Sequence, residues 1–143
     1  MFKASTAIYE QLFGDLKTED GTVPLSCSTQ VLKQFKSIMT PDFVKELLSL
    51  LDLDDSETLS KSEFMRFCYI AENTFKPRDT ARSLFCFADA DFSGSIDAQE
   101  FVWIMHRIIG EFSDADMTQA FKECATGEAM DYETFMLLMR EFA

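Results

Sequence analysis

The segment DADFSGSIDAQE, residues 89–100, decides how the rest of the chain is interpreted. Oxygen-bearing side chains recur at alternate positions, and a glutamate closes the segment. The residues that offer candidate ligand oxygens are Asp89, Asp91, Ser93, Ser95, Asp97 and Glu100. Gly94 stands at the sixth position, where a glycine can turn the backbone with a positive φ angle without a clash at Cβ. Ile96 is apolar among polar neighbours, so we expect it to face a second loop.

This spacing predicts a calcium site, because calcium is a hard cation that binds about six to eight oxygen atoms. The first three of these side chains can each supply one oxygen, and Ser95 can supply its backbone carbonyl. Asp97 can bind through a water molecule, and Glu100 can offer both carboxylate oxygens. The simpler alternative is a solvated acidic turn between two helices.

Apolar residues at helical spacing flank this segment on both sides. The residues that lead into it are Ala81, Leu84, Phe85 and Ala88, and those that lead out are Phe101, Ile104, Met105 and Ile108. Such spacing places each set on one face of a helix. The segment is therefore predicted to be a loop between two amphipathic helices.

The same helix–loop–helix pattern occurs four times, at intervals of about 35–40 residues. One apolar residue stands in the middle of each loop, and these inward residues are Val23, Leu59, Ile96 and Met130. Paired loops can exchange a short β-bridge at this position. We therefore expect an all-α fold with two lobes, residues 1–75 and 76–143, each holding two helix–loop–helix units joined by such a bridge.

The second loop, DLDDSETLSKSE at residues 52–63, keeps several ligand positions but lacks the glycine. Its candidate ligands are Asp52, Asp54, Ser56, Thr58, Ser60 and Glu63. Glu57 stands at the sixth position, where a left-handed conformation costs a residue with a Cβ about 1–2 kcal/mol. Such a cost weakens binding about five- to thirtyfold, so calcium binding by this loop remains an open question.

The first and last loops lack the carboxylates that calcium requires. In the first, residues 15–27, neither a frame starting at Asp15 nor one starting at Leu16 retains a ligand set. In the last, residues 125–134, counting back from Phe135 places Thr134 at the closing position. A deletion of two residues is the alternative frame, and neither version can hold calcium.

Helix signals divide the chain further. Thr40 is a suitable N-cap with Pro41 as the first helical residue, and Ser113 with Asp116 forms a capping pair. Gly14 is expected to end the first helix. The segment NTFKP, residues 73–77, is expected to separate the lobes.

In that segment, Asn73 is the expected C-cap of the preceding helix. Pro77 excludes a helical conformation at Lys76 and fits the first turn of the next helix. A break is therefore expected here instead of one long helix.

Composition limits the partner classes. Of the 143 residues, 25 are acidic and 13 basic, which gives a net charge of -12. Nucleic acids and anionic membranes are poor partners for such a chain, whereas a cation or a basic peptide is favoured. No apolar run reaches the roughly 18 residues of a membrane span, and the first ten residues lack the layout of a signal peptide. We therefore expect a cytoplasmic protein, with association with the cytoskeleton left open.

The residues give no indication of an enzyme. The chain has no glycine-rich phosphate loop, and its single histidine, His106, lies on a predicted helix without a nucleophilic partner. One histidine also excludes most zinc sites. The scattered cysteines are expected to be free thiols in or near the core; they are Cys27, Cys68, Cys86 and Cys124.

With its segment FADADFSGSIDAQEF at residues 87–101, the whole chain resembles the calmodulin superfamily of EF-hand proteins, whose members include troponin C, centrins and myosin light chains. The resemblance implies four EF-hands, of which only the third retains a near-complete ligand set. It also implies a partner, an amphipathic basic helix such as an IQ-type helix, held in apolar grooves by a monomeric protein. The matching groove positions are Met105, Phe121, Leu138 and Met139 in the second lobe and Leu47, Phe67 and Cys68 in the first.

Two functions remain open within this resemblance. In the first, calcium binding at residues 89–100 draws Glu100 inward and opens the second lobe onto its target helix. In the second, the chain is a light-chain-like subunit that stays on a helix of a myosin or similar scaffold whatever the calcium level. The groove positions are alternatively simple core residues, and Trp103 is either a half-buried surface residue or a partner contact.

Overall fold

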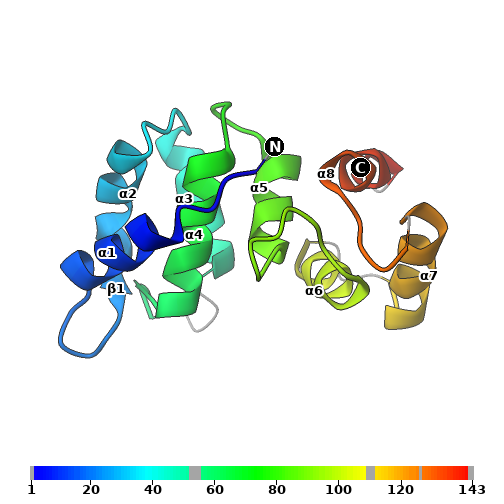
Figure 1. Ribbon diagram of the computed structural model, residues 1–143, viewed down its shortest axis with the longest axis horizontal. Coiled ribbons are helices and arrows are strands. Elements are labelled where there is room, and N and C mark those ends of the chain that lie inside the picture. The colour runs from blue at the N-terminus through cyan, green and yellow to red at the C-terminus, as the bar shows by residue number, and fades with distance from the viewer. Residues whose placement is uncertain (1, 52–55, 109–111, 126, 142–143) are drawn as a thin grey trace. The chain divides into compact units, whose positions relative to one another are not determined.

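The computed structural model of the chain describes residues 2–51, 56–108, 112–125 and 127–141 (Figure 1). Over these residues the protein is mostly helical, with eight α-helices, one 3₁₀ turn and a two-stranded sheet. No helix in the described part is long and apolar enough to cross a membrane. The chain forms two compact units, here called the N-unit (Phe2–Asp79) and the C-unit (Thr80–Ala143).

Each unit contains two helix–loop–helix segments. The N-unit contains α1 (Thr6–Leu16), β1 (Val23–Pro24), the 3₁₀ turn (Leu25–Cys27), α2 (Ser28–Gln34), α3 (Pro41–Leu51), β2 (Thr58–Leu59) and α4 (Lys61–Asn73). The C-unit contains α5 (Thr80–Ala88), α6 (Ala98–Ile108), α7 (Asp114–Cys124) and α8 (Tyr132–Glu141). The interhelical segments are called loop 1 (17–24), loop 2 (52–60), loop 3 (89–97) and loop 4 (125–131).

The four apolar residues in the middle of the loops pair as the sequence predicts. Val23 lies opposite Leu59 in the antiparallel pairing of β1 and β2. Ile96 and Met130 form an isolated antiparallel bridge, in which each amide donates to the other's carbonyl, at 2.9 and 2.7 Å. All four side chains are buried, so each bridge also contributes to the core of its unit.

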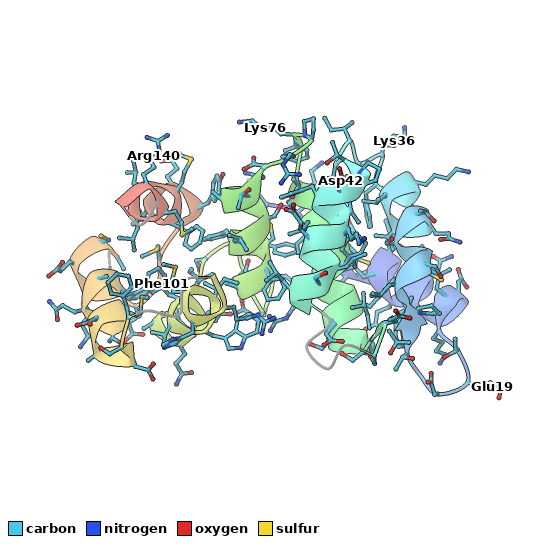
Figure 2. All side chains as sticks on the ribbon, turned by 180° about the vertical axis from the view of Figure 1, so that it is seen from behind. Glu19, Lys36, Asp42, Lys76, Phe101 and Arg140 are labelled. Atoms are coloured by element: carbon cyan, nitrogen blue, oxygen red, sulfur yellow. The ribbon has the colours of Figure 1, made fainter. Side chains whose placement is uncertain are left out.

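Phenylalanine and tyrosine rings fill the interior of both units. In the N-unit, Phe13 packs on Phe64 with ring centroids 5.8 Å apart. In the C-unit, Phe101 contacts Phe121 of α7 and Phe135 of α8, with ring centroids 5.7 and 6.5 Å apart (Figure 2). Full burial of such a side chain stabilises the fold by about 1.5–3 kcal/mol, so these rings account for the chain's high phenylalanine content.

Both predicted helix starts are confirmed. Helix α3 begins at Pro41, and the hydroxyl of Thr40 accepts from the amide of Phe43 at 3.3 Å. Helix α7 begins after Ser113, whose hydroxyl accepts from the amide of Asp116 at 3.2 Å. Hydroxyl caps of this kind satisfy amides that have no partner within the helix.

Three predicted boundaries differ from the structure. Helix α1 continues through Gly14 to Leu16, because contacts between α1 and α4 outweigh the low helix propensity of one glycine. Pro77 precedes α5, which begins at Thr80, and its carbonyl accepts from the amide of Thr40 at 3.1 Å. Asn73 is the last residue of α4, with Thr74 as the cap. The expected break between helices at residues 73–77 is present.

The cysteine prediction holds in part. All four thiols are free, and Cys68 and Cys86 are buried. Cys27 is half-buried, but Cys124 is exposed on α7 and does not belong to the core. Burial raises the pKa of the Cys68 thiol to about 12, which keeps it protonated and unreactive.

An unforeseen hydrogen-bond network ties the start of the chain to the end of α4. The carboxylate of Glu72 accepts from the Ser5 amide and hydroxyl, at 2.9 and 2.6 Å, and from the Tyr9 hydroxyl at 2.5 Å. Next to it, the side chain of Asn73 exchanges two hydrogen bonds with the backbone of Lys3, both 2.7 Å long. Helix α1 is thereby held against α4 at its first turn.

The network lowers the pKa of Glu72. Partial burial opposes ionisation, but hydrogen bonds from Ser5 and Tyr9 outweigh it and hold the pKa below the usual glutamate value. A depressed pKa in the folded state stabilises the protein above the ordinary pKa, and this contribution is lost as the pH falls through the folded value.

We expect Tyr9→Phe to lower the free energy of unfolding by about 1 kcal/mol at pH 7, because it removes one hydrogen bond to a carboxylate. Urea unfolding measures the change, and the difference from wild type should shrink as the pH falls through the lowered pKa of Glu72, where its carboxylate becomes protonated. In a Glu72→Gln background the same substitution should cost less. Equal costs in both backgrounds would show that the network does not couple these residues.

Candidate metal centre

Loop 3 begins with a buried aspartate. Asp89 follows directly on α5 and is 0% exposed. One of its carboxylate oxygens accepts from the amide and hydroxyl of Ser93, at 3.1 and 3.2 Å. The other accepts from the amide of Gly94 at 2.8 Å. These bonds curl the loop around the Asp89 carboxylate.

Gly94 and Phe92 make this curl possible through their backbone conformation. Gly94 has a φ angle of +85° and Phe92 one of +57°. A φ angle of +85° is strained for a residue with a Cβ atom, which explains the glycine at the sixth position of the loop. The carboxylate of Asp91 accepts from the Ser93 amide at 3.3 Å, and hydrogen bonding from Ser93 lowers the pKa of Asp91.

Glu100 reaches across the loop from the first turn of α6. One of its carboxylate oxygens accepts from the amide of Asp97 and the other from the amide of Ala90, both at 2.9 Å. The Asp97 carboxylate in turn accepts from the amide of Glu100 at 2.8 Å. Partial burial raises the pKa of Glu100 despite these two amide donors.

The structure thus brings three of the predicted ligands together. Carboxylate oxygens of Asp89, Asp91 and Glu100 lie within 4.8 Å of one another. Ser93 stands beside them, and its hydroxyl donates to the carbonyl of Ser95 at 3.0 Å. Asp97 is not part of the triad, because its carboxylate caps α6.

The donor set fits a hard divalent cation. Every candidate ligand is a carboxylate, hydroxyl or carbonyl oxygen, which suits calcium or magnesium and not a thiophilic metal. Three carboxylates within 4.8 Å repel one another, and a bound cation would neutralise that repulsion.

Loop 4 is shorter than loop 3, as the second of the two predicted frames requires. Loop 3 spans nine residues between helices (89–97), whereas loop 4 spans seven (125–131). Loop 4 still turns through Gly127, which has a φ angle of +84°. At its end, the Asp131 carboxylate caps α8 by accepting from the amide of Thr134 at 2.9 Å. Loop 4 is therefore two residues shorter than loop 3, as the second frame expects.

Loop 1 is closed by hydrogen bonds around a single carboxylate. Asp20 accepts from the amide and hydroxyl of Thr22, at 3.1 and 2.8 Å, and from the hydroxyl of Thr18. These bonds lower the pKa of Asp20, with that from Thr18 contributing most. Glu19 lies at the outer end of the loop (Figure 2). Neutral donors thus satisfy the exposed carboxylate of Asp20.

Loop 2 retains its turn, but part of its ligand set serves another purpose. Asp52 and Asp54 lie outside the described residues. Ser60 and Glu63 form a reciprocal capping box at the start of α4, with bonds of 2.8 and 3.3 Å. Glu57 has a φ angle of +63°, which confirms the left-handed conformation expected at this position.

The residues matched to apolar grooves are mostly core. Six of the seven are buried: Met105, Phe121 and Leu138 in the C-unit and Leu47, Phe67 and Cys68 in the N-unit. Met139 is half-buried. The abundance of methionine and phenylalanine therefore does not indicate an exposed groove at these positions, because the same residues are needed to fill the two interiors.

Trp103 and His106 lie on the surface of α6. Trp103 is 36% exposed and stacks on Phe87 with ring centroids 5.2 Å apart. The guanidinium of Arg107 lies 5.5 Å from the centre of the Trp103 ring, and His106 pairs with Asp114. Trp103 is therefore a surface residue, and its contact with a partner stays a prediction.

No family model matches the chain, and no curated protein matches it by sequence.

The backbone conformations of Gly94, Glu57 and Gly14 predict how three substitutions change the stability of the protein. Gly94→Ala should destabilise the protein by about 1–2 kcal/mol, because only the backbone conformation opposes the added methyl group. Glu57→Gly should stabilise it, since glycine relieves the same strain in loop 2. Gly14→Ala, in the interior of a helix with open space around it, should stabilise it by about 0.5–1 kcal/mol.

Urea unfolding in chelator measures all three changes without a contribution from metal ions. Gly14→Ala is expected to stabilise the protein. If Gly94→Ala stabilised it as well, loop 3 would not adopt the described turn in solution.

Proposed function

We propose that the chain is a calcium-binding regulatory protein of the EF-hand type, similar to calmodulin, and that residues 89–100 are its calcium loop. The observation that carries this proposal is the convergence of Asp89, Asp91 and Glu100 within 4.8 Å, with Asp89 buried. In a solvated acidic turn all three carboxylates would be exposed, whereas here only Asp91 is exposed. Here the loop backbone holds them together despite their mutual repulsion.

Each ligand has a role in the proposed site. The side chains of Asp89, Asp91 and Ser93 supply one oxygen each, Ser95 supplies its carbonyl, and Glu100 supplies both carboxylate oxygens. Asp97 acts through water, which suits a carboxylate that also caps α6. When bound, calcium would neutralise the charges of the carboxylates and stabilise the loop. The protein contributes the loop conformation that brings these carboxylates together.

The proposed partner is an amphipathic basic helix of a target protein. A net charge of -12 favours a basic ligand over nucleic acid or an anionic membrane. The N-unit also contains a cavity of about 570 Å³ between α2 and α3. Its apolar lining residues are Leu25, Leu32, Met39, Val44 and Leu48, which suits apolar side chains of a helix.

A second candidate is a light-chain-like subunit that binds an IQ-type helix independently of calcium. The loss of calcium-ligand carboxylates from loops 1 and 4 favours it, because a subunit that binds its helix at any calcium level does not need those ions. In either case we propose a cytoplasmic protein that is monomeric apart from its target and has no enzymatic activity.

Calorimetric titration with calcium should show one strong site. Glu100→Gln should weaken binding tenfold or more, a loss of about 1.4 kcal/mol, because it removes one charge and one of two ligand oxygens. The matched control is Glu123→Gln, the same change at an exposed position on α7, which should leave affinity within about twofold. Unchanged binding in Glu100→Gln would refute the ligand assignment.

Titration with a basic IQ-type peptide distinguishes the two candidates. A calcium-dependent regulator should bind the peptide with different affinities in calcium and in chelator, since a ligand shifts an equilibrium only through its different affinity for the two states. A light-chain-like subunit should bind with the same affinity in both. Absence of peptide binding under both conditions would exclude both functions.

A further inference from the structure

We propose, on the basis of the proposed function, that calcium binds to loop 3 without opening the C-unit. The ion would stabilise the loop and the packed interior together and would not expose an apolar groove between the helices. This inference concerns how the site regulates the protein, and it departs from the mechanism in which Glu100 must move inward.

The first observation is the position of Glu100. Its carboxylate already extends to the second residue of the loop, where it accepts from the amide of Ala90 at 2.9 Å. It also lies within 4.8 Å of the carboxylate oxygens of Asp89 and Asp91. Glu100 therefore needs no large movement to become a ligand.

The second observation is that the interior is closed in the same structure. Phe101 directly follows Glu100 and is completely buried between Phe121 and Phe135. Further along α6, Ile104 and Met105 are also buried. The inward position of Glu100 and the closed packing of α6 against α7 and α8 thus occur together, so the first does not require loss of the second.

The third observation is the rigid connection to loop 4. Both hydrogen bonds of the bridge between Ile96 and Met130 are present, and both side chains are completely buried. Loop 4 has two residues fewer than loop 3, and Asp131 caps α8 directly after the bridge. The bridge thus holds Met130, which lies two residues before α8, against loop 3.

These observations have an energetic consequence. A ligand shifts a conformational equilibrium only by its difference in affinity between the two states. A closed unit that already presents the carboxylates of Asp89, Asp91 and Glu100 does not have to open in order to bind the ion. Opening would expose large buried rings to water. Calcium binding would offset that cost only if the open unit bound the ion more tightly than the closed one.

Methyl and amide NMR of the full chain in chelator and in calcium tests the inference. The amides of Ala90, Ser93, Gly94 and Asp97 donate to ligand carboxylates, and their resonances report ion binding. The methionine methyl groups of Met105, Met117 and Met130 are buried in the C-unit, and their resonances report its packing. Met39, buried in the N-unit, serves as the reference.

We expect the loop amides to shift on addition of calcium while the three C-unit methyl resonances change no more than that of Met39. Binding of an apolar dye should not increase. If amides and methyl groups shift together and dye binding rises, the C-unit opens and this inference is wrong, although calcium binding stands. If the amides do not respond to calcium, the proposed function itself fails, and the inference fails with it.

Discussion

The backbone bridges between paired loops are the interaction on which both units depend. A loop between two diverging helices has few backbone partners of its own, and buried amides and carbonyls without partners are costly. The pairings of Val23 with Leu59 and of Ile96 with Met130 meet this requirement and place an apolar side chain in the core at the same point. A loop can therefore lose its metal ligands and still be needed for folding.

Loops 1, 3 and 4 stabilise their turns in different ways. Loop 3 gathers carboxylates, loop 1 satisfies Asp20 with threonine hydroxyls and an amide, and loop 4 is shortened to seven residues. Hydroxyl and amide donors stabilise a carboxylate without a cation, whereas three converging carboxylates repel one another. The proposed binding of calcium by loop 3, and not by loops 1 and 4, follows from this difference.

Local patterns predicted much of the fold. Thr40 and Ser113 cap helices as expected, the inward residues pair correctly, and the ligands Asp89, Asp91 and Glu100 converge. The sequence could not show that Ser5 and Tyr9 bind Glu72, because that contact joins residues more than sixty positions apart. It also could not separate core from groove at Met105 or Phe121, since both roles require the same apolar spacing.

The most direct test of the account is a crystal structure of the full chain grown with calcium. We predict one ion in loop 3, with oxygens of Asp89, Asp91, Ser93, Ser95 and Glu100 at about 2.3–2.6 Å. In the same crystal, Met105 and Phe121 should remain buried in the C-unit. A calcium-saturated crystal in which this loop binds no ion, with Glu100 directed into solvent, would contradict the account.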